Sequence, residues 1–201
     1  MTQPSHVLLA MRRAVLSVLL VAPTLAFDPA ALALSQTDKV NPQAAGMYEF
    51  QQRLNAYLKL REDLSEKLKP LSTTASAAEL TARQDALAAA LRAARKAARP
   101  GDLIPPSVAN QIVKVCTEDF HFRNPEVKRA ALQEVPNAPR PAINRTYPEN
   151  EALATVPPLL LSKLPVLPDN LQYRFFGRHL VILDGDTQII IDYIANVVPP
   201  R

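Results

Sequence analysis

The sequence has only one cysteine, four glycines and three histidines among its 201 residues, and it has no tryptophan. Because Cys116 stands alone, no disulfide can form within the chain. Four scattered glycines supply neither the phosphate-binding loop of nucleotide enzymes nor the G-x-S-x-G turn of serine hydrolases. The candidate acids and bases are Glu118 with Asp119 and Asp184 with Asp186, but neighbouring acidic residues are common on protein surfaces. We therefore predict that the protein is not an enzyme.

A strong net charge is also lacking, since the formal charge is only +4. This charge is too small to indicate nucleic acid as a partner. Metal ligands are equally sparse: Cys116, Glu118, Asp119 and His121 would have to converge, and no second cysteine or histidine lies nearby at ligand spacing. The D-G-D run at 184–186 resembles part of a calcium loop but lacks the carboxylate required at the twelfth position. We predict neither a metal nor another cofactor.

The N-terminal segment has the order of a secretory signal peptide. An apolar run at 14–27 follows two arginines and precedes a small-x-small site at 31–33. The run is shorter than the roughly 20 residues of a membrane span. We expect residues 1–33 to be removed, no stable membrane anchor to remain, and the product to be periplasmic or secreted. A start at Met11 would give a signal peptide of more ordinary proportions, and both starts stay open.

Two amphipathic helices are expected in the first half of the mature chain. The first spans 41–69, where an Asn-Pro pair is typical of a helix start and apolar residues recur at three- and four-residue steps. Arg61 takes one position of this apolar seam. The second helix spans 77–99, begins at a capping box formed by Ser76 and Glu79, and has an alanine-rich seam. The short connection between them predicts an αα-hairpin.

The second helix carries a group of cations on its expected outer face. We interpret this face in two ways: it binds an acidic partner, or it is a solvated surface whose cations lie favourably near a helix C-terminus. The candidate partner-binding residues are Arg83, Arg92, Arg95, Lys96 and Arg99.

Two further helices are expected within 105–134, the second of them capped by Asn124. On the first of these helices Cys116 shares a face with valine and isoleucine side chains, so we predict that the thiol is buried in the core. A redox or dimer-forming role for Cys116 is the alternative.

Proline and glycine divide the rest of the sequence into segments. Prolines recur through 135–170 and predict an extended strap rather than a regular helix. Because its V-P-P-L-L-L and L-P-V-L-P runs are apolar, we expect the strap to pack on the core, with recognition by a partner as the alternative. All four glycines (Gly46, Gly101, Gly177 and Gly185) fall beside expected ends of elements, where a positive φ is most useful.

Residues 171–195 predict a three-stranded antiparallel meander. Gly177-Arg178 forms a two-residue loop with glycine first, as a type II′ hairpin turn requires, and D-G-D-T turns the chain again. Valine and isoleucine on both faces of the later strands indicate that the sheet is covered and completes the core. His179 is expected to be a packed or exposed strand residue rather than a catalytic base.

The last 45 or so residues resemble the C-terminal end of a group of exported bacterial proteins of unknown function. The resemblance rests on Pro-Pro, Leu-Pro-x-Leu-Pro, Tyr-Arg-Phe-x-Gly-Arg and a closing Ile-x-Asp-Tyr-Ile. The segment is more loosely similar to the C-terminal hairpin of periplasmic nickel/cobalt homeostasis proteins, but the His-rich segment of those proteins is missing, so their metal role does not carry over. L-T-A-R-Q at 80–84 resembles a pattern of small helical periplasmic chaperones.

The sequence therefore predicts a mainly helical α+β protein: a signal peptide (1–33) and a single mature domain (34–201). That domain combines a helical hairpin, two further helices, a proline-rich strap and a C-terminal meander. We expect an exported, non-catalytic protein of the cell envelope, with an interaction or structural role and an unknown protein partner. The alternative is a periplasmic holdase-type chaperone that uses the basic helical face.

Overall fold

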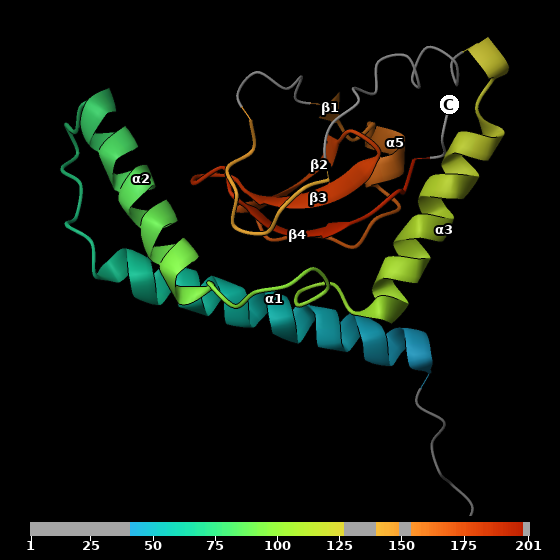
Figure 1. Cartoon of the computed structure of the whole chain (residues 1–201), viewed down its shortest axis with the longest axis horizontal. Coiled ribbons are helices and arrows are strands. Elements are labelled where there is room, and N and C mark those ends of the chain that lie inside the picture. The colour runs from blue at the N-terminus through green and yellow to red at the C-terminus, as the bar shows by residue number, and fades with distance from the viewer. Residues whose placement is uncertain (1–40, 127–139, 149–153, 199–201) are drawn as a thin grey trace, which may run out of the picture. The chain divides into compact units, whose positions relative to one another are not determined.

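Long helices make up most of the first half of the structure. The computed structural model describes residues 41–126, 140–148 and 154–198 (Figure 1), so the expected signal peptide lies outside the described residues. The helices are α1 (Pro42–Glu66), α2 (Ala77–Ala94), α3 (Pro106–Phe122) and the short α5 (Pro158–Leu161). None of the described helices has the length and apolar character that crossing a bilayer requires.

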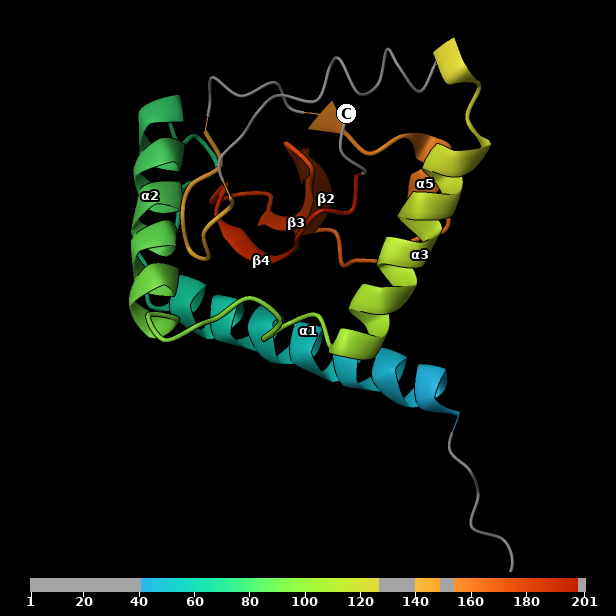
Figure 2. The same ribbon diagram turned by 45° about the vertical axis from the view of Figure 1, so that its right-hand side comes forward.

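The helices begin where their capping residues indicate. The Asn41 side chain accepts a hydrogen bond from the Gln43 backbone N–H at 3.0 Å, and Pro42 occupies the first turn of α1. Ser76 and Glu79 form the expected capping box of α2. α2 ends at Ala94, before the expected residue 99, and the chain continues in turns. α1 and α2 are in contact, but α2 is steeply inclined to α1 in both views rather than running alongside it (Figures 1 and 2).

The C-terminal meander is present and gains one short strand at its edge. The sheet is antiparallel with the order β1-β2-β3-β4. Gly177 in the β2–β3 turn has a φ of 55°, and Arg178 has no positive φ, which fits the expected type II′ turn. The pairing of β3 with β4 is irregular between Ile182 and Leu183. The strands are β1 (Ala154–Thr155), β2 (Leu171–Phe176), β3 (His179–Asp184) and β4 (Ile190–Ile194).

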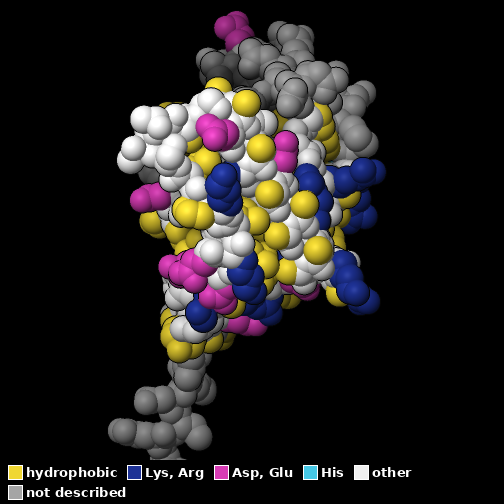
Figure 3. Space-filling model, turned by 90° about the vertical axis from the view of Figure 1, so that its left-hand side faces the viewer, with side chains coloured by type: hydrophobic (Ala, Val, Ile, Leu, Met, Phe, Trp, Pro, Cys, Tyr) yellow, Lys and Arg dark blue, Asp and Glu magenta, His cyan; other side chains and the backbone are white. Residues whose placement is uncertain are grey.

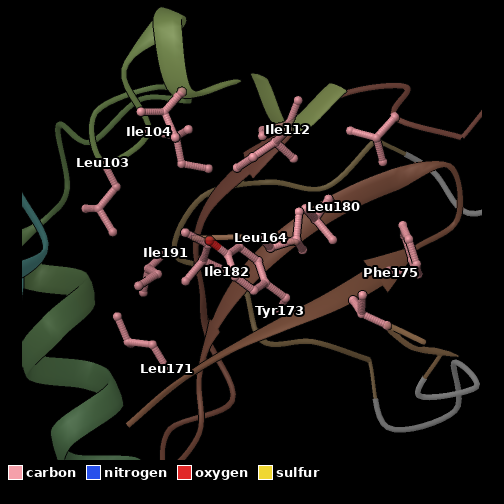
Figure 4. Close-up of a cluster of buried hydrophobic side chains, with 14 of the residues drawn as sticks. Leu103, Ile104, Ile112, Leu164, Leu171, Tyr173, Phe175, Leu180, Ile182 and Ile191 are labelled. Atoms are coloured by element: carbon pink, nitrogen blue, oxygen red, sulfur yellow. The ribbon is translucent and has the colours of Figure 1, made fainter. Parts of the chain in front are cut away.

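Both faces of the sheet are buried. Because side chains alternate along a strand, Leu180 and Ile182 lie in the main core, whereas Val181 and Leu183 lie in a second apolar cluster on the opposite face. The main core joins the sheet to α1, α2 and α3, and Figure 4 shows its side chains converging from strands and helices. The meander therefore forms part of the core, as the sequence predicts.

Three sequence-based expectations need correction. The strap is not wholly extended, since α5 forms at Pro158, where proline suits the first turn of a helix. Gly46 lies inside α1 rather than at its end, and it is buried. Its lack of a side chain allows close contact with α3, since an added Cβ would overlap Ser107 Oγ and lie 3.0 Å from Ser107 Cβ. Gly185 has no positive φ. Most of the expected fourth helix lies outside the described residues; within them, Asn124 Oδ1 accepts the Glu126 N–H at 2.9 Å, as a cap would.

Candidate functional site

Two of the five basic side chains expected on the outer face of α2, Arg83 and Arg95, bond to other parts of the fold instead. Arg83 donates to the carbonyl oxygen of Ser65 at 3.0 Å and so ties α2 to the end of α1. Arg95 is only 9% exposed, donates to the Ile191 carbonyl oxygen at 2.8 Å and lies over the Tyr57 ring. Arg95 is therefore part of the interior, contrary to its expected place on a solvated face.

The other members of the predicted set have different surroundings. Lys96 and Arg99 are exposed beyond the C-terminal end of α2. Arg92 is partly exposed and points toward the segment 140–148, where it donates to the Asn144 carbonyl oxygen at 3.1 Å and to Thr146 Oγ1 at 2.6 Å. The five cations therefore do not form one surface.

Asp184, a candidate acid or base, is fully buried and has several hydrogen-bond donors. Its Oδ2 accepts from Tyr57 Oη at 2.8 Å and from Arg61 Nε at 2.9 Å, and its Oδ1 accepts from Thr187 N and Oγ1. Arg61 also pairs with Asp186. Burial, followed by the charge of Asp184, raises the pKa of Tyr57. The carboxylate is saturated with donors, which is typical of a structural ion pair rather than of a group that exchanges protons.

A second buried carboxylate holds the loop between α2 and α3. Asp192 accepts hydrogen bonds from the backbone N–H groups of Gly101, Leu103 and Ile104, each at 2.8 Å. Burial raises the pKa of Asp192, and these N–H groups partly offset the effect because they favour the charged form. Like Asp184, Asp192 therefore has a structural role, because its oxygens accept hydrogen bonds from the backbone of the loop at 101–104.

Cys116 is buried in α3, as the sequence predicts. Burial, followed by the charge of Asp119, raises the pKa of its thiol to about 11. Asp119 pairs with Arg123, whereas Glu118 and His121 are exposed. Within the described residues no three histidine, cysteine, aspartate or glutamate side chains are grouped to hold a metal ion.

Arg92 lines a cleft of about 630 Å³ together with Arg140 and Arg145 of the segment 140–148. This cleft, here called the arginine cleft, lies between α2, that segment and the sheet. Figure 3 shows the face that carries α2, with several Lys and Arg side chains (dark blue) together along its right edge. None of the described residues that line the cleft is acidic. The lining residues are Arg92, Arg140, Pro141, Ala142, Asn144, Arg145, Thr146, Pro148, Phe176 and Ile190.

The three arginines of the cleft are held to different degrees. Arg92 uses Nε and Nη2 in its hydrogen bonds, and no described residue bonds its Nη1, which can therefore donate to a ligand. The guanidinium group of Arg140 lies 5.9 Å from the centre of the Tyr193 ring, within the range of a cation–π contact. Arg140 and Arg145 are both exposed. Three positive charges without a described acidic neighbour make the cleft a place where anions concentrate.

One wall of the arginine cleft is fixed by backbone pairing with the edge of β4. The N–H of Asn144 donates to the Ile190 carbonyl oxygen at 2.8 Å, and the Ile190 N–H donates back to the Arg145 carbonyl oxygen at 2.9 Å. Tyr147 N–H donates to the Gln188 carbonyl oxygen at 2.7 Å. These bonds hold the segment 144–147 in place beside the sheet.

Sequence reasoning found Arg92 but missed Arg140 and Arg145. Both lie in the segment interpreted as a strap, and only tertiary pairing with β4 brings them to α2. The available signal was two isolated arginines in an otherwise apolar, proline-containing run, R-P-A-I-N-R.

Comparisons with protein-family models, with curated proteins and with solved structures give no match to this chain.

Proposed function

We propose that this protein is an exported, non-catalytic protein of the cell envelope that acts by binding a protein partner through the arginine cleft. The observation that carries the proposal is the convergence of Arg92, Arg140 and Arg145 on one cleft that has no described acidic lining residue. Cations that serve stability are normally paired or buried, as Arg61 and Arg95 are. Exposed cations that have apolar neighbours and no acidic partner among the described residues are typical of a binding surface.

The state of the buried carboxylates supports a non-catalytic role. Asp184 and Asp192 each accept several hydrogen bonds and hold neighbouring elements together. A general acid or base needs a free lone pair or proton directed at a substrate, and neither carboxylate offers one.

Export is proposed from the sequence, and N-terminal sequencing of the protein purified from its native cell tests it. A mature chain that begins at Leu34 supports export with cleavage after the site at 31–33. A full-length chain recovered from the cytoplasm would refute it.

Partner binding is tested by placing a photo-crosslinking amino acid at Ala142, which is exposed and lines the arginine cleft. Ala89, exposed on α2 outside the cleft lining, serves as the control position. We expect irradiation of intact cells to give a discrete crosslinked protein from position 142 and none from position 89. The same product from both positions, or from neither, would refute binding through the cleft.

The holdase alternative has one supporting observation at the α1–α2 junction. Leu71 and Leu80 are 39% and 45% exposed and line one pocket together. Leu71 also lines a neighbouring cavity of about 360 Å³ with Leu68. Because Arg83 and Arg95 are engaged inside the fold, the basic helical face is smaller than the sequence predicts. A holdase suppresses aggregation of an unfolded client at near-equal stoichiometry, and Leu71→Ser with Leu80→Ser should abolish that effect.

A further inference from the structure

We propose that the arginine cleft recognises an acidic peptide segment that also carries an apolar side chain. This inference rests on the proposed function and names the chemistry of the partner. In the bound state, carboxylates of the segment pair with Arg140 and Arg145 and reach Nη1 of Arg92, while the apolar side chain covers Ala142 and Pro148.

The charges of the cleft specify an anionic ligand with more than one negative group. Guanidinium groups bind carboxylates through paired, charge-assisted hydrogen bonds. Arg92 is already fixed by its bonds to Asn144 and Thr146, so binding costs little ordering of that side chain. Arg140 is partly held by its position over Tyr193. Three cations around one cleft are best neutralised by at least two carboxylates.

The floor of the cleft specifies an apolar component. Phe176 and Ile190 form its base but are only 5% and 2% exposed, so they offer little surface to a ligand. The accessible apolar lining comes from Ala142, which is exposed, and Pro148, which is half-buried. A bare polyanion would leave this surface uncovered, whereas a leucine or phenylalanine side chain would cover it and gain hydrophobic stabilisation.

The solvent exposure of Arg140 and Arg145 favours a peptide over a small molecule as the ligand. Small-molecule sites bury most of the ligand surface, but Arg140 and Arg145 are exposed at the margin of this cleft. A segment of a larger partner can lie across such a margin. Recognition must go through side chains, because the N–H groups of Asn144 and Tyr147 already donate to the carbonyl oxygens of Ile190 and Gln188 and so are not open to a peptide backbone.

Fluorescence anisotropy with the mature chain and three labelled peptides tests the inference. The peptides are GEEFEEG, its amide analogue GQQFQQG, and GEESEEG, which keeps the charge and loses the apolar side chain. We expect GEEFEEG to bind at least tenfold more tightly than either analogue, which corresponds to a total loss of about 1.4 kcal/mol or more in binding free energy. Equal binding of GQQFQQG, or of GEESEEG, would overturn the charged or the apolar part of the proposal.

Two double variants that remove the same charge, one inside and one outside the arginine cleft, identify the binding site. Arg140→Gln with Arg145→Gln should weaken GEEFEEG binding at least tenfold, whereas Lys96→Gln with Arg99→Gln, which removes the same charge outside the cleft lining, should change it less than twofold. A similar loss of GEEFEEG affinity in both double variants would mean non-specific electrostatic attraction and would refute the arginine cleft as the binding site. Tighter binding of inorganic polyphosphate than of GEEFEEG would also refute a peptide ligand.

Failure of this inference is separable from failure of the proposed function. If GEEFEEG does not bind but position 142 still crosslinks a cellular protein, the acidic-peptide chemistry is wrong and partner binding through the cleft stands. If the peptide binds but no crosslinked protein forms in cells, the chemistry of the cleft is supported and the proposed cellular role is refuted.

Discussion

The hydroxyl group of Tyr57 in α1 donates a hydrogen bond to Asp184 Oδ2 at the end of β3 over 2.8 Å, although 127 residues separate the two in the sequence. Arg61, one helical turn further along α1, reaches the same oxygen. The first helix of the described structure is thus fixed to the C-terminal sheet by polar contacts within an apolar interface. Stability of the helices and stability of the sheet are consequently coupled.

Replacing Arg61 should test the buried ion pair. Arg61→Met leaves Asp184 fully buried without its cation, so we expect the free energy of unfolding to fall by about 3 kcal/mol in urea denaturation. Lys59→Met, which breaks an exposed pair with Asp63, is the control and should change it by less than about 0.5 kcal/mol. Equal effects of the two substitutions would contradict the role of the buried pair.

Tyr173 and Tyr57 should respond oppositely to loss of the hydroxyl group. Tyr173 Oη is buried and has no hydrogen-bond partner among the described residues, and Figure 4 shows the side chain among Leu164, Ile182 and Ile191. We expect Tyr173→Phe to raise the free energy of unfolding by about 1 kcal/mol, because an unsatisfied buried polar group is removed. Tyr57→Phe should lower it by a similar amount, since Asp184 loses a donor. Destabilisation by Tyr173→Phe would indicate a partner for that hydroxyl.

The contact between α1 and α3 should depend on the absence of a side chain at position 46. Gly46→Ala places a methyl group against Ser107, and despite the better helix propensity of alanine we expect a loss of about 1–3 kcal/mol from overpacking. Ser107→Gly should restore most of this loss in the double variant, because the overlapping atoms belong to the serine side chain. Thermal melts of the four chains measure the coupling, and strictly additive effects would exclude it.

Acid should weaken the structure through His179. Burial, followed by the charges of Arg140 and Arg178, lowers the pKa of this imidazole, and its Nδ1 accepts a hydrogen bond from Asn196 N–H. The unfolded chain therefore binds a proton more readily, so stability should fall as the pH drops below about 6.5, the pKa of a free histidine, and level off below the folded pKa. His179→Gln should remove this component of the pH profile of unfolding, whereas His121→Gln, at an exposed position, should retain it.

Cys116 should resist thiol reagents in the folded protein. The side chain is fully buried and its pKa of about 11 keeps it protonated at neutral pH. We expect labelling by a maleimide only at the rate of unfolding, and rapid labelling once urea exceeds the unfolding midpoint. Fast modification of the native protein would contradict the burial.

Local chemistry made much of this fold predictable from sequence. Helix starts at Asn41 and Ser76 use side chains that bond backbone N–H groups within the same turn, and Gly177 supplies the positive φ that its hairpin turn needs. Each of these features is decided by residues close together in the sequence. The same holds for the burial of Cys116, which follows from the apolar face of a single helix.

Features decided by distant residues were not predictable in the same way. The sequence shows Arg61 at a position of the apolar seam of α1, but its burial beside Asp184 could not be predicted without the register of the sheet. The arginine cleft depends on backbone pairing between residues 144–147 and β4, for which the strap segment gives no periodic signal. Arg95 likewise enters the interior because the Ile191 carbonyl oxygen is available there.

Asp192 makes the geometry of the loop at 101–104 depend on a distant strand. Three backbone N–H groups of that loop share this one carboxylate, which belongs to β4. The loop between α2 and α3 therefore cannot settle into its final geometry until β4 is in place, so in folding kinetics the ordering of this loop should follow formation of the sheet.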